Sequence, residues 1–176
     1  MAEVNERYSL IARSIHWLTA LLVLSMVPAG LIMIRISGGP LQNQLFDFHR
    51  SVGVVLMILT VIRLAYRLTH PPAPLPADIP PVQQLAAKAT HVFLYLFLLV
   101  NPFIGWVATS AYGASISVFG VFTMPAIVAK DRALAEQLFA VHEILGLLFT
   151  AAVLMHIAAA LYHGIIRRDG VLSRMV

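Results

Sequence analysis

The sequence predicts an all-α membrane protein, a four-transmembrane-helix bundle, and its composition and apolar pattern support that prediction. The chain has 176 residues, of which 60% are hydrophobic and 11% are charged, with a mean hydropathy of +0.85. Soluble domains are typically about 45–50% apolar and about 25% charged. The apolar residues also gather in long runs, each close to the roughly 20 residues that a helix needs to cross a bilayer. The lipid bilayer is therefore the expected solvent for most of this chain.

The apolar residues form four such runs, at residues 16–34, 49–66, 91–109 and 141–166. Because each helix can begin before its apolar run, we expect helices over about 10–35, 45–67, 85–109 and 137–167. The last run is long enough for its helix to tilt or to project beyond the membrane. We expect the four helices to form one domain over residues 1–176.

Segments of different composition connect the predicted helices. Residues 38–40, Gly-Gly-Pro, mark a turn between the first two. Residues 70–81 hold six prolines, which predicts a stiff, extended connection. Residues 111–133 mix glycine, serine and aromatic side chains, so we expect a loop there, with a short surface helix around 126–136.

The charged residues predict how the chain lies in the membrane. A cleaved secretory signal is not expected, because Glu3 and Glu6 lie where such a signal is basic and the first apolar run is long enough to span. Lysine and arginine collect on cytoplasmic flanks. The side with both termini and the proline-rich connection carries seven of them, namely Arg7, Arg13, Arg67, Lys88, Arg167, Arg168 and Arg174. The other side carries four, namely Arg35, Arg50, Lys130 and Arg132. Both termini are therefore expected in the cytoplasm.

Six of the seven histidines lie in or at the ends of the apolar runs. His70 is the exception: it lies in the proline-rich connection, where we expect it to be solvated. Ionisable side chains within a span usually face the bundle interior and have a partner or a function. Six of them make a merely structural role a poor explanation. These six are His16, His49, His91, His142, His156 and His163.

The spacing of two histidines in the fourth run indicates the cofactor. His142 and His156 are 14 residues apart, which places them within about 40° of one helix face and about 21 Å apart along the axis. One helix then offers a ligand in each leaflet. Two opposed neutral imidazoles suit a low-spin haem iron, and a bundle in a bilayer offers the dry cavity that a haem needs. The spacing predicts two b-type haems stacked across the bilayer.

Each haem needs a second histidine from another helix. On the outer side His49 is the only candidate partner for His142. On the inner side several histidines lie at a depth similar to that of His156, and their positions do not decide which one is the ligand. The candidates are His16, His91 and His163.

Three further residues share the 14-residue offset. Gly30 and Gly105 each lie 14 residues after an inner-level histidine, so both should reach the outer haem level. A porphyrin between helices needs such missing side chains, although glycine also allows close helix packing. Arg63 lies 14 residues after His49. It can meet an inner haem propionate or extend to the interface.

Other metal chemistry fits less well. The chain has no cysteine, which excludes disulfides, thiolate zinc sites and iron–sulfur clusters. Zinc prefers four clustered ligands, whereas these histidines are divided between leaflets. Copper leaves the regular separation unexplained. A membrane metal transporter is therefore the weakest of the alternatives.

Short stretches around these residues occur in a specific order along nearly the whole chain. They are Arg7-Tyr8-Ser9, Ser14-Ile15-His16-Trp17, Phe48-His49-Arg50-Ser51-Val52-Gly53, Arg63-Leu64-Ala65-Tyr66-Arg67, His91-Val92-Phe93-Leu94-Tyr95, Pro102-Phe103-Ile104-Gly105-Trp106 and His142-Glu143-Ile144-Leu145-Gly146, then His156 and His163. In this order they resemble the prokaryotic cytochrome b561 family, four-helix di-haem b cytochromes of the bacterial inner membrane.

The resemblance implies a role for each histidine of the spans. It implies that His16 and His156 bind the inner haem, and that His49 and His142 bind the outer one. It also implies a quinone site near the cytoplasmic surface that is lined by residues which are not haem ligands. The candidates for that site are His91 and His163, with Arg13 or Ser14 at the start of the first helix.

The resemblance also implies a reaction. Family members look like superoxide oxidases, in which superoxide gives one electron on the periplasmic side and ubiquinone is reduced within the membrane. Outer cations can attract this anion, unless nearby carboxylates neutralise them; the candidates are Arg35, Arg50, Lys130 and Arg132. The alternative is an electron relay to quinone from another one-electron donor, a docked dehydrogenase or hydrogenase. No nucleic-acid partner is expected.

Overall fold

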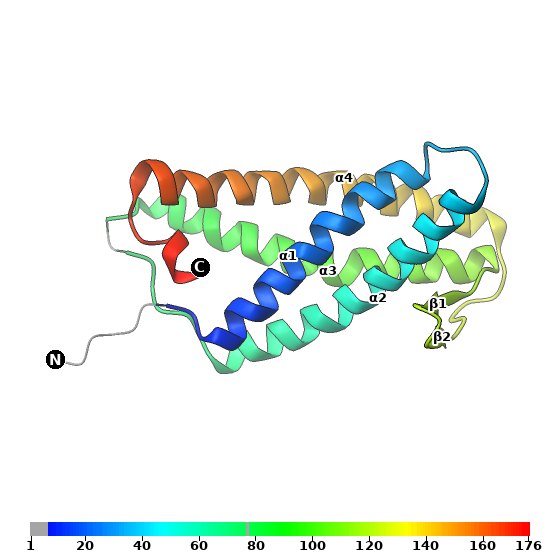
Figure 1. Ribbon diagram of the computed structural model, residues 1–176, viewed down its shortest axis with the longest axis horizontal. Coiled ribbons are helices and arrows are strands. Elements are labelled where there is room, and N and C mark those ends of the chain that lie inside the picture. Colours follow the sequence, from blue (N-terminus) through cyan, green and yellow to red (C-terminus); the bar gives the residue numbers. More distant parts are fainter. Residues whose placement is uncertain (1–6, 77) are drawn as a thin grey trace.

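The computed structural model describes residues 7–76 and 78–176, so Glu3 and Glu6 lie outside the described residues. Its four long helices run side by side along the length of the molecule (Figure 1). By length and composition, all four are able to cross a membrane, which confirms the predicted four-helix membrane bundle. They are α1 (Leu10–Met33), α2 (Pro40–Thr69), α3 (Pro81–Tyr112) and α4 (Arg132–Leu161), the last continued by the π-helix η1 (Tyr162–Arg167).

Three helices begin several residues before their predicted starts, because the residues there favour helix initiation. α2 and α3 begin at Pro40 and Pro81, whose rings fix a helical φ at a position that needs no N–H donor. α4 begins after Asp131, whose carboxylate accepts a hydrogen bond from the Leu134 amide at 3.0 Å. The prediction of a separate surface helix around 126–136 is therefore wrong, because the second half of that range forms the first turn of α4.

The two ends of the bundle differ. One end, here called the termini end, holds the described parts of both chain termini and the proline-rich connection (Figure 1). The opposite end, here called the loop end, holds the α1–α2 turn, where Gly38 and Gly39 have φ of +70° and +93°. Glycine adopts such values without strain. The loop end also holds an antiparallel hairpin of β1 (Ile116–Val118) and β2 (Phe122–Met124).

This hairpin was not predicted, and α2 holds it in place. The Ser51 hydroxyl donates to the Ser117 carbonyl at 3.1 Å and accepts from the Phe119 amide at 3.0 Å. Strands of three residues are too short to be stable alone. The segment 111–133 is therefore ordered by its contacts with the bundle.

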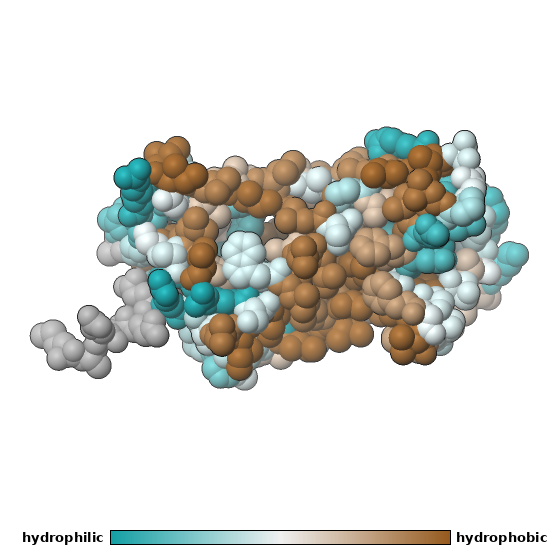
Figure 2. Space-filling view, in the orientation of Figure 1, coloured by the Kyte–Doolittle hydropathy of each residue, from teal (hydrophilic) through white to brown (hydrophobic). Residues whose placement is uncertain are grey.

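The helices pack as two pairs around a small core. α1 lies along α2 and α3 along α4, while the pairs meet mainly through α2 and α3. One residue from each helix forms what is here called the core layer: Val23, Leu56, Leu98 and Phe149. On the face shown in Figure 2, apolar side chains also cover much of the middle, whereas polar ones lie more toward the two ends. This distribution suits a bilayer around the middle of the molecule.

After η1 the chain folds back against the start of α1. Arg168 has φ 52° and reverses the chain direction. The Tyr8 amide then donates to the Arg174 carbonyl at 3.0 Å, and the Trp17 indole donates to the Met175 carbonyl at 2.9 Å. Residues from both ends of the described chain thus lie together at the termini end.

Candidate functional site

Five histidines, one arginine and two glycines of the bundle interior lie in two layers, on either side of the core layer. Each core-layer residue is seven residues from one of them in both directions along its own helix. Seven residues are about two turns, so the side chain returns to nearly the same face about 10.5 Å along the axis. The termini-end layer holds His16, Arg63, His91 and His156. The loop-end layer holds Gly30, His49, Gly105 and His142.

In the loop-end layer, two histidines face each other from helices that are not paired. The ring centroids of His49 on α2 and His142 on α4 are 6.0 Å apart, with the ring planes at 83°. Imidazoles that bind one metal ion from opposite sides have centroids about 6.3 Å apart, because each metal–nitrogen bond is about 2.0–2.1 Å and each centroid lies about 1.1 Å further out. The predicted outer pair is therefore spaced as such ligands are.

Main-chain carbonyls set the tautomer of both rings. His49 Nδ1 lies 3.3 Å from the Met26 carbonyl oxygen, and His142 Nδ1 lies 2.9 Å from that of Asn101. Because a carbonyl can only accept, each ring donates from Nδ1 and keeps the Nε2 lone pair for a metal. As they stand, these two side chains fit a haem iron.

The two glycines of the loop-end layer make room for these rings. A Cβ added at Gly30 would lie 2.8 Å from His49 Cε1, and one added at Gly105 would lie 3.0 Å from His142 Cε1. Both glycines thus lie at the level expected for them. Each lies against a histidine ring on the helix paired with its own.

In the termini-end layer, His156 faces two histidines instead of one. Its ring centroid is 6.3 Å from that of His16 and 5.6 Å from that of His91. Arg63 donates from Nη2 to His16 Nδ1 at 2.8 Å, and its guanidinium lies over the Tyr95 ring. His16 therefore has its proton on Nε2, and Arg63 must leave before His16 can bind a metal through Nε2. This layer fits a haem after one side-chain movement, and its spacing alone allows either partner for His156.

A half-buried arginine near this layer has one buried nitrogen without a hydrogen-bond partner among the described residues. Arg13 lies one turn before His16, and its Nε is buried with no hydrogen-bond partner among the described residues. A buried charged donor is costly unless an acceptor meets it. A carboxylate or carbonyl oxygen would satisfy it, as a haem propionate or a quinone offers. Ser14 is exposed on the neighbouring face of α1.

His163 lies beyond this layer, in η1, and is bonded to an aspartate that was not predicted. His163 Nδ1 is 2.6 Å from Asp169 Oδ2, and the Asp169 side chain is only 5% exposed. Burial alone would raise the pKa of the Asp169 carboxyl. Hydrogen bonds from His163 and the Val171 amide, together with the charge of Arg167, outweigh burial and hold that pKa below its usual value. Asp169 therefore stays ionised at neutral pH and orients the His163 ring.

The four cations predicted to attract an anion all lie at the loop end, and carboxylates accompany two of them. Arg50 Nη2 is 3.8 Å from Asp47, and Arg132 Nε is 3.1 Å from Glu136. Arg50 also donates to the Ser115 carbonyl at 3.0 Å, so it links the segment before β1 to α2. Two cations form no ion pair with a carboxylate of the described residues, namely Arg35 and Lys130.

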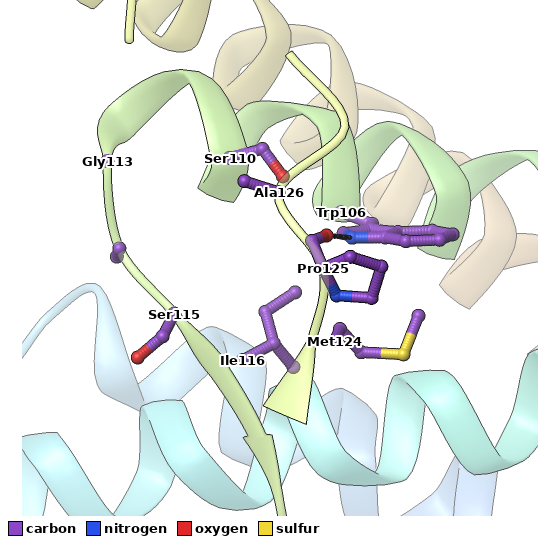
Figure 3. A pocket seen from close by; sticks show the side chains of 9 residues that line it. Trp106, Ser110, Gly113, Ser115, Ile116, Met124, Pro125 and Ala126 are labelled. Atoms are coloured by element: carbon purple, nitrogen blue, oxygen red, sulfur yellow. Dashed lines mark hydrogen bonds between the residues drawn. The ribbon is translucent and has the colours of Figure 1, made fainter. Parts of the chain in front are cut away.

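The hairpin also lines an open cavity of about 260 Å³ at the loop end. Figure 3 shows the Trp106 indole donating to the Pro125 carbonyl, at 2.9 Å, beside Ile116 and Met124. No ionisable side chain is among the residues that line this cavity. It therefore lacks the charge that would hold a small anion.

The chain is similar to known proteins over nearly its whole length. A profile of the family described as prokaryotic cytochrome b561 matches residues 7–176. Cytochrome b561 homolog 2 of Escherichia coli strain K12 is 38% identical over 173 residues, which are 97% of this chain and 92% of the relative. The probable superoxide oxidase CybB of Yersinia pestis is 28% identical over 174 residues, 98% of this chain and 97% of the relative. These matches confirm the family resemblance seen in the sequence.

Replacing Gly30 with alanine tests the packing of the loop-end layer. Alanine in a helix is usually more stable than glycine by about 1 kcal/mol, but here the new Cβ would lie 2.8 Å from the His49 ring. We expect Gly30→Ala to displace that ring and lower the haem-to-protein ratio to about half, as measured by pyridine haemochrome absorbance. The control is Gly53→Ala on α2, where an added Cβ meets no atom within 4 Å. Equal haem content in the two variants would contradict this role of Gly30.

Proposed function

This chain belongs to the prokaryotic cytochrome b561 family, and from that premise we propose that it transfers electrons from superoxide to ubiquinone. Membership makes it a multi-pass protein of the bacterial inner membrane, with a role in transmembrane electron transfer and with haem b as its cofactor. The two substrates and the number of two haems are the proposal. The observation that carries it is the pair of histidine layers, about 21 Å apart, on either side of an apolar core layer.

The proposed ligands are His49 and His142 for one haem and His16 and His156 for the other. When bound, each haem supplies reversible one-electron redox chemistry. The carbonyl-bonded Nδ1 atoms of the loop-end pair support the first assignment. The second follows the family pattern, and the 6.3 Å separation of the two rings is compatible with it. In this assignment Arg63 would release His16 and would be free to hold a haem propionate.

The proposed direction is from the loop end to the termini end. The excess of cations at the termini end supports a cytoplasmic position for both termini. Superoxide then arrives at the loop end, in the periplasm. Two superoxide ions lose one electron each and leave as dioxygen; one ubiquinone takes up these two electrons and two protons to become ubiquinol.

The proposed quinone site lies at the termini end. His163 is the proton-carrying group there, and Asp169 holds its ring by the 2.6 Å hydrogen bond. Arg13 offers a buried donor for a quinone carbonyl. The further candidates at this end are His91 and Ser14.

A relay from a docked redox enzyme is the second candidate function. Phe119, Val121 and Phe122 are exposed apolar side chains on the loop-end hairpin, and such groups suit a protein contact. Electrons would then come from that partner in place of superoxide. Metal transport has little support, because the described residues include no group of three or more histidine, aspartate or glutamate side chains that could hold an ion.

Two variants test the ligand assignment at the termini-end layer. His91→Leu should keep both haems and their low-spin absorbance spectra, because His91 is not a ligand in this proposal. His16→Leu should lower the haem-to-protein ratio to about half. Loss of a haem in the His91 variant, with none lost in the His16 variant, would reverse the assignment.

Removing the charge of Arg35 or Lys130, which form no ion pair with a carboxylate of the described residues, tests the superoxide step. We expect Arg35→Gln and Lys130→Gln to slow haem reduction by superoxide several-fold at low ionic strength and less at high ionic strength, because salt screens exposed charges beyond about 10 Å at 0.1 M. The measurement is stopped-flow haem absorbance. Lys88→Gln, which makes the same charge change at the termini end, should have no effect. Rates that do not change with salt would remove the attraction of superoxide by these cations.

Removing the charge of Asp169 tests the proposed proton transfer to quinone. Asp169→Asn keeps a hydrogen-bond acceptor for His163 but removes the charge that stabilises its protonated form. We expect kcat for ubiquinol formation to fall about tenfold, with the KM for quinone, haem content and haem reduction by superoxide unchanged. Asp169→Glu should recover part of the rate. Wild-type ubiquinol formation in Asp169→Asn would exclude this role.

A further inference from the structure

The connection between α3 and α4 carries no charged side chain over 16 residues, 114–129. The β1–β2 hairpin lies within it, and the turn of this hairpin presents large apolar side chains outward. Phe119 is 58% exposed, Val121 81% and Phe122 48%; these three residues are here called the hairpin tip. Neighbouring exposed apolar side chains mark a contact with another apolar surface. The tip therefore needs an apolar environment that the described chain does not supply.

The hairpin lies against the side of the bundle and does not extend beyond the loop end (Figure 1). The Ser51 hydroxyl of α2 is bonded to the backbone of Ser117 and Phe119. Val54 packs with the two buried side chains of β1. Ser51 and Val54 follow His49 by two and five residues, in the direction of the core layer. Where it contacts α2, the hairpin thus lies between the loop-end layer and the core layer.

The core layer lies near the middle of the membrane. Each of its residues is within five residues of the midpoint of its apolar run. The hydrocarbon part of a bilayer is about 30 Å thick, so its edge is about 15 Å from the middle. Ser51 is five residues from Leu56, which is about 7.5 Å along the helix. The hairpin therefore meets α2 at the depth of the lipid acyl chains.

At that depth, the backbone of the hairpin needs hydrogen-bond partners other than water. Pairing of the two strands supplies some of them. The Arg50 guanidinium also donates to the Ser115 carbonyl before β1, and the Trp106 indole donates to the Pro125 carbonyl after β2. With the two bonds of Ser51, side chains of α2 and α3 thus meet backbone groups on both sides of the tip. This arrangement suits a hairpin that is held inside a bilayer.

We propose that the hairpin tip is embedded in the membrane, among the acyl chains of the leaflet at the loop end. Two observations favour lipid over a protein partner. The connection offers no charge that a docked protein could pair with. The tip also continues the apolar outer surface of α2, on which Ile58 is 50% exposed. The lipid then holds the connection against the helix that carries His49.

The experiment uses the absence of cysteine from the chain, because a single introduced thiol then reports on one position. Haem-loaded Val121→Cys is placed in lipid nanodiscs with one copy per disc, and its labelling by a charged maleimide is followed by mass spectrometry. The controls are Ser37→Cys, in the exposed α1–α2 turn at the same end, and Ile58→Cys. Haem absorbance checks that each variant is folded.

We expect Val121→Cys to react with the charged maleimide at least about tenfold more slowly than Ser37→Cys, because a charged reagent does not enter hydrocarbon. Ile58→Cys should be as slow. An apolar maleimide, which dissolves in the bilayer, should label Val121→Cys and Ile58→Cys at similar rates.

Two results would overturn the proposal. If the charged maleimide labels Val121→Cys as fast as Ser37→Cys, the tip is in water and is open to a docked redox partner. If Val121→Cys resists both maleimides while the apolar one labels Ile58→Cys, protein and not lipid covers the tip. A second copy cannot cause protection, since each disc holds one. Labelling involves neither superoxide nor quinone, so its outcome is independent of the proposed electron transfer.

Discussion

A register of seven residues, shared by all four helices, organises the interior of this protein. Seven residues bring a side chain back to within about 20° of the same helix face, so three residues spaced by seven on each helix lie at three levels of the interior. Val23, Leu56, Leu98 and Phe149 meet at the middle level and fix the helices against one another. A slip of one helix by a single turn, about 5.4 Å, would separate the ring pairs above and below this core.

The two histidine layers differ in how far the protein prepares them. Main-chain carbonyls orient His49 and His142, and a carbonyl keeps its position because the helix holds it. Arg63, in contrast, occupies the ring nitrogen of His16 that would otherwise donate when Nε2 binds a metal. The loop-end layer is thus set by the backbone. The termini-end layer is set by a long side chain, that of Arg63, which donates to His16.

The sequence predicted the features that follow from helical periodicity, and missed those that follow from tertiary contacts. The spans and the level of Gly30 needed only spacing. The starts of α2 and α3 were also predictable, because proline favours the first helical position. The hairpin depends on Ser51 of a distant helix, and the Asp169–His163 bond depends on a chain reversal after η1, so neither has a periodic signal. The depth of a histidine in the membrane could not show whether His16 or His91 is the second ligand of the inner haem, because both rings lie near His156.

Ubiquinol yield tests the central claim, which is electron transfer between the two ends of the bundle. The purified haem-loaded protein is reconstituted in liposomes that contain ubiquinone, and superoxide is generated outside. We expect ubiquinol at half the molar amount of superoxide consumed, and none with protein in which His142 is replaced by leucine. Superoxide consumption without ubiquinol, or the same yield from the His142 variant, would contradict it.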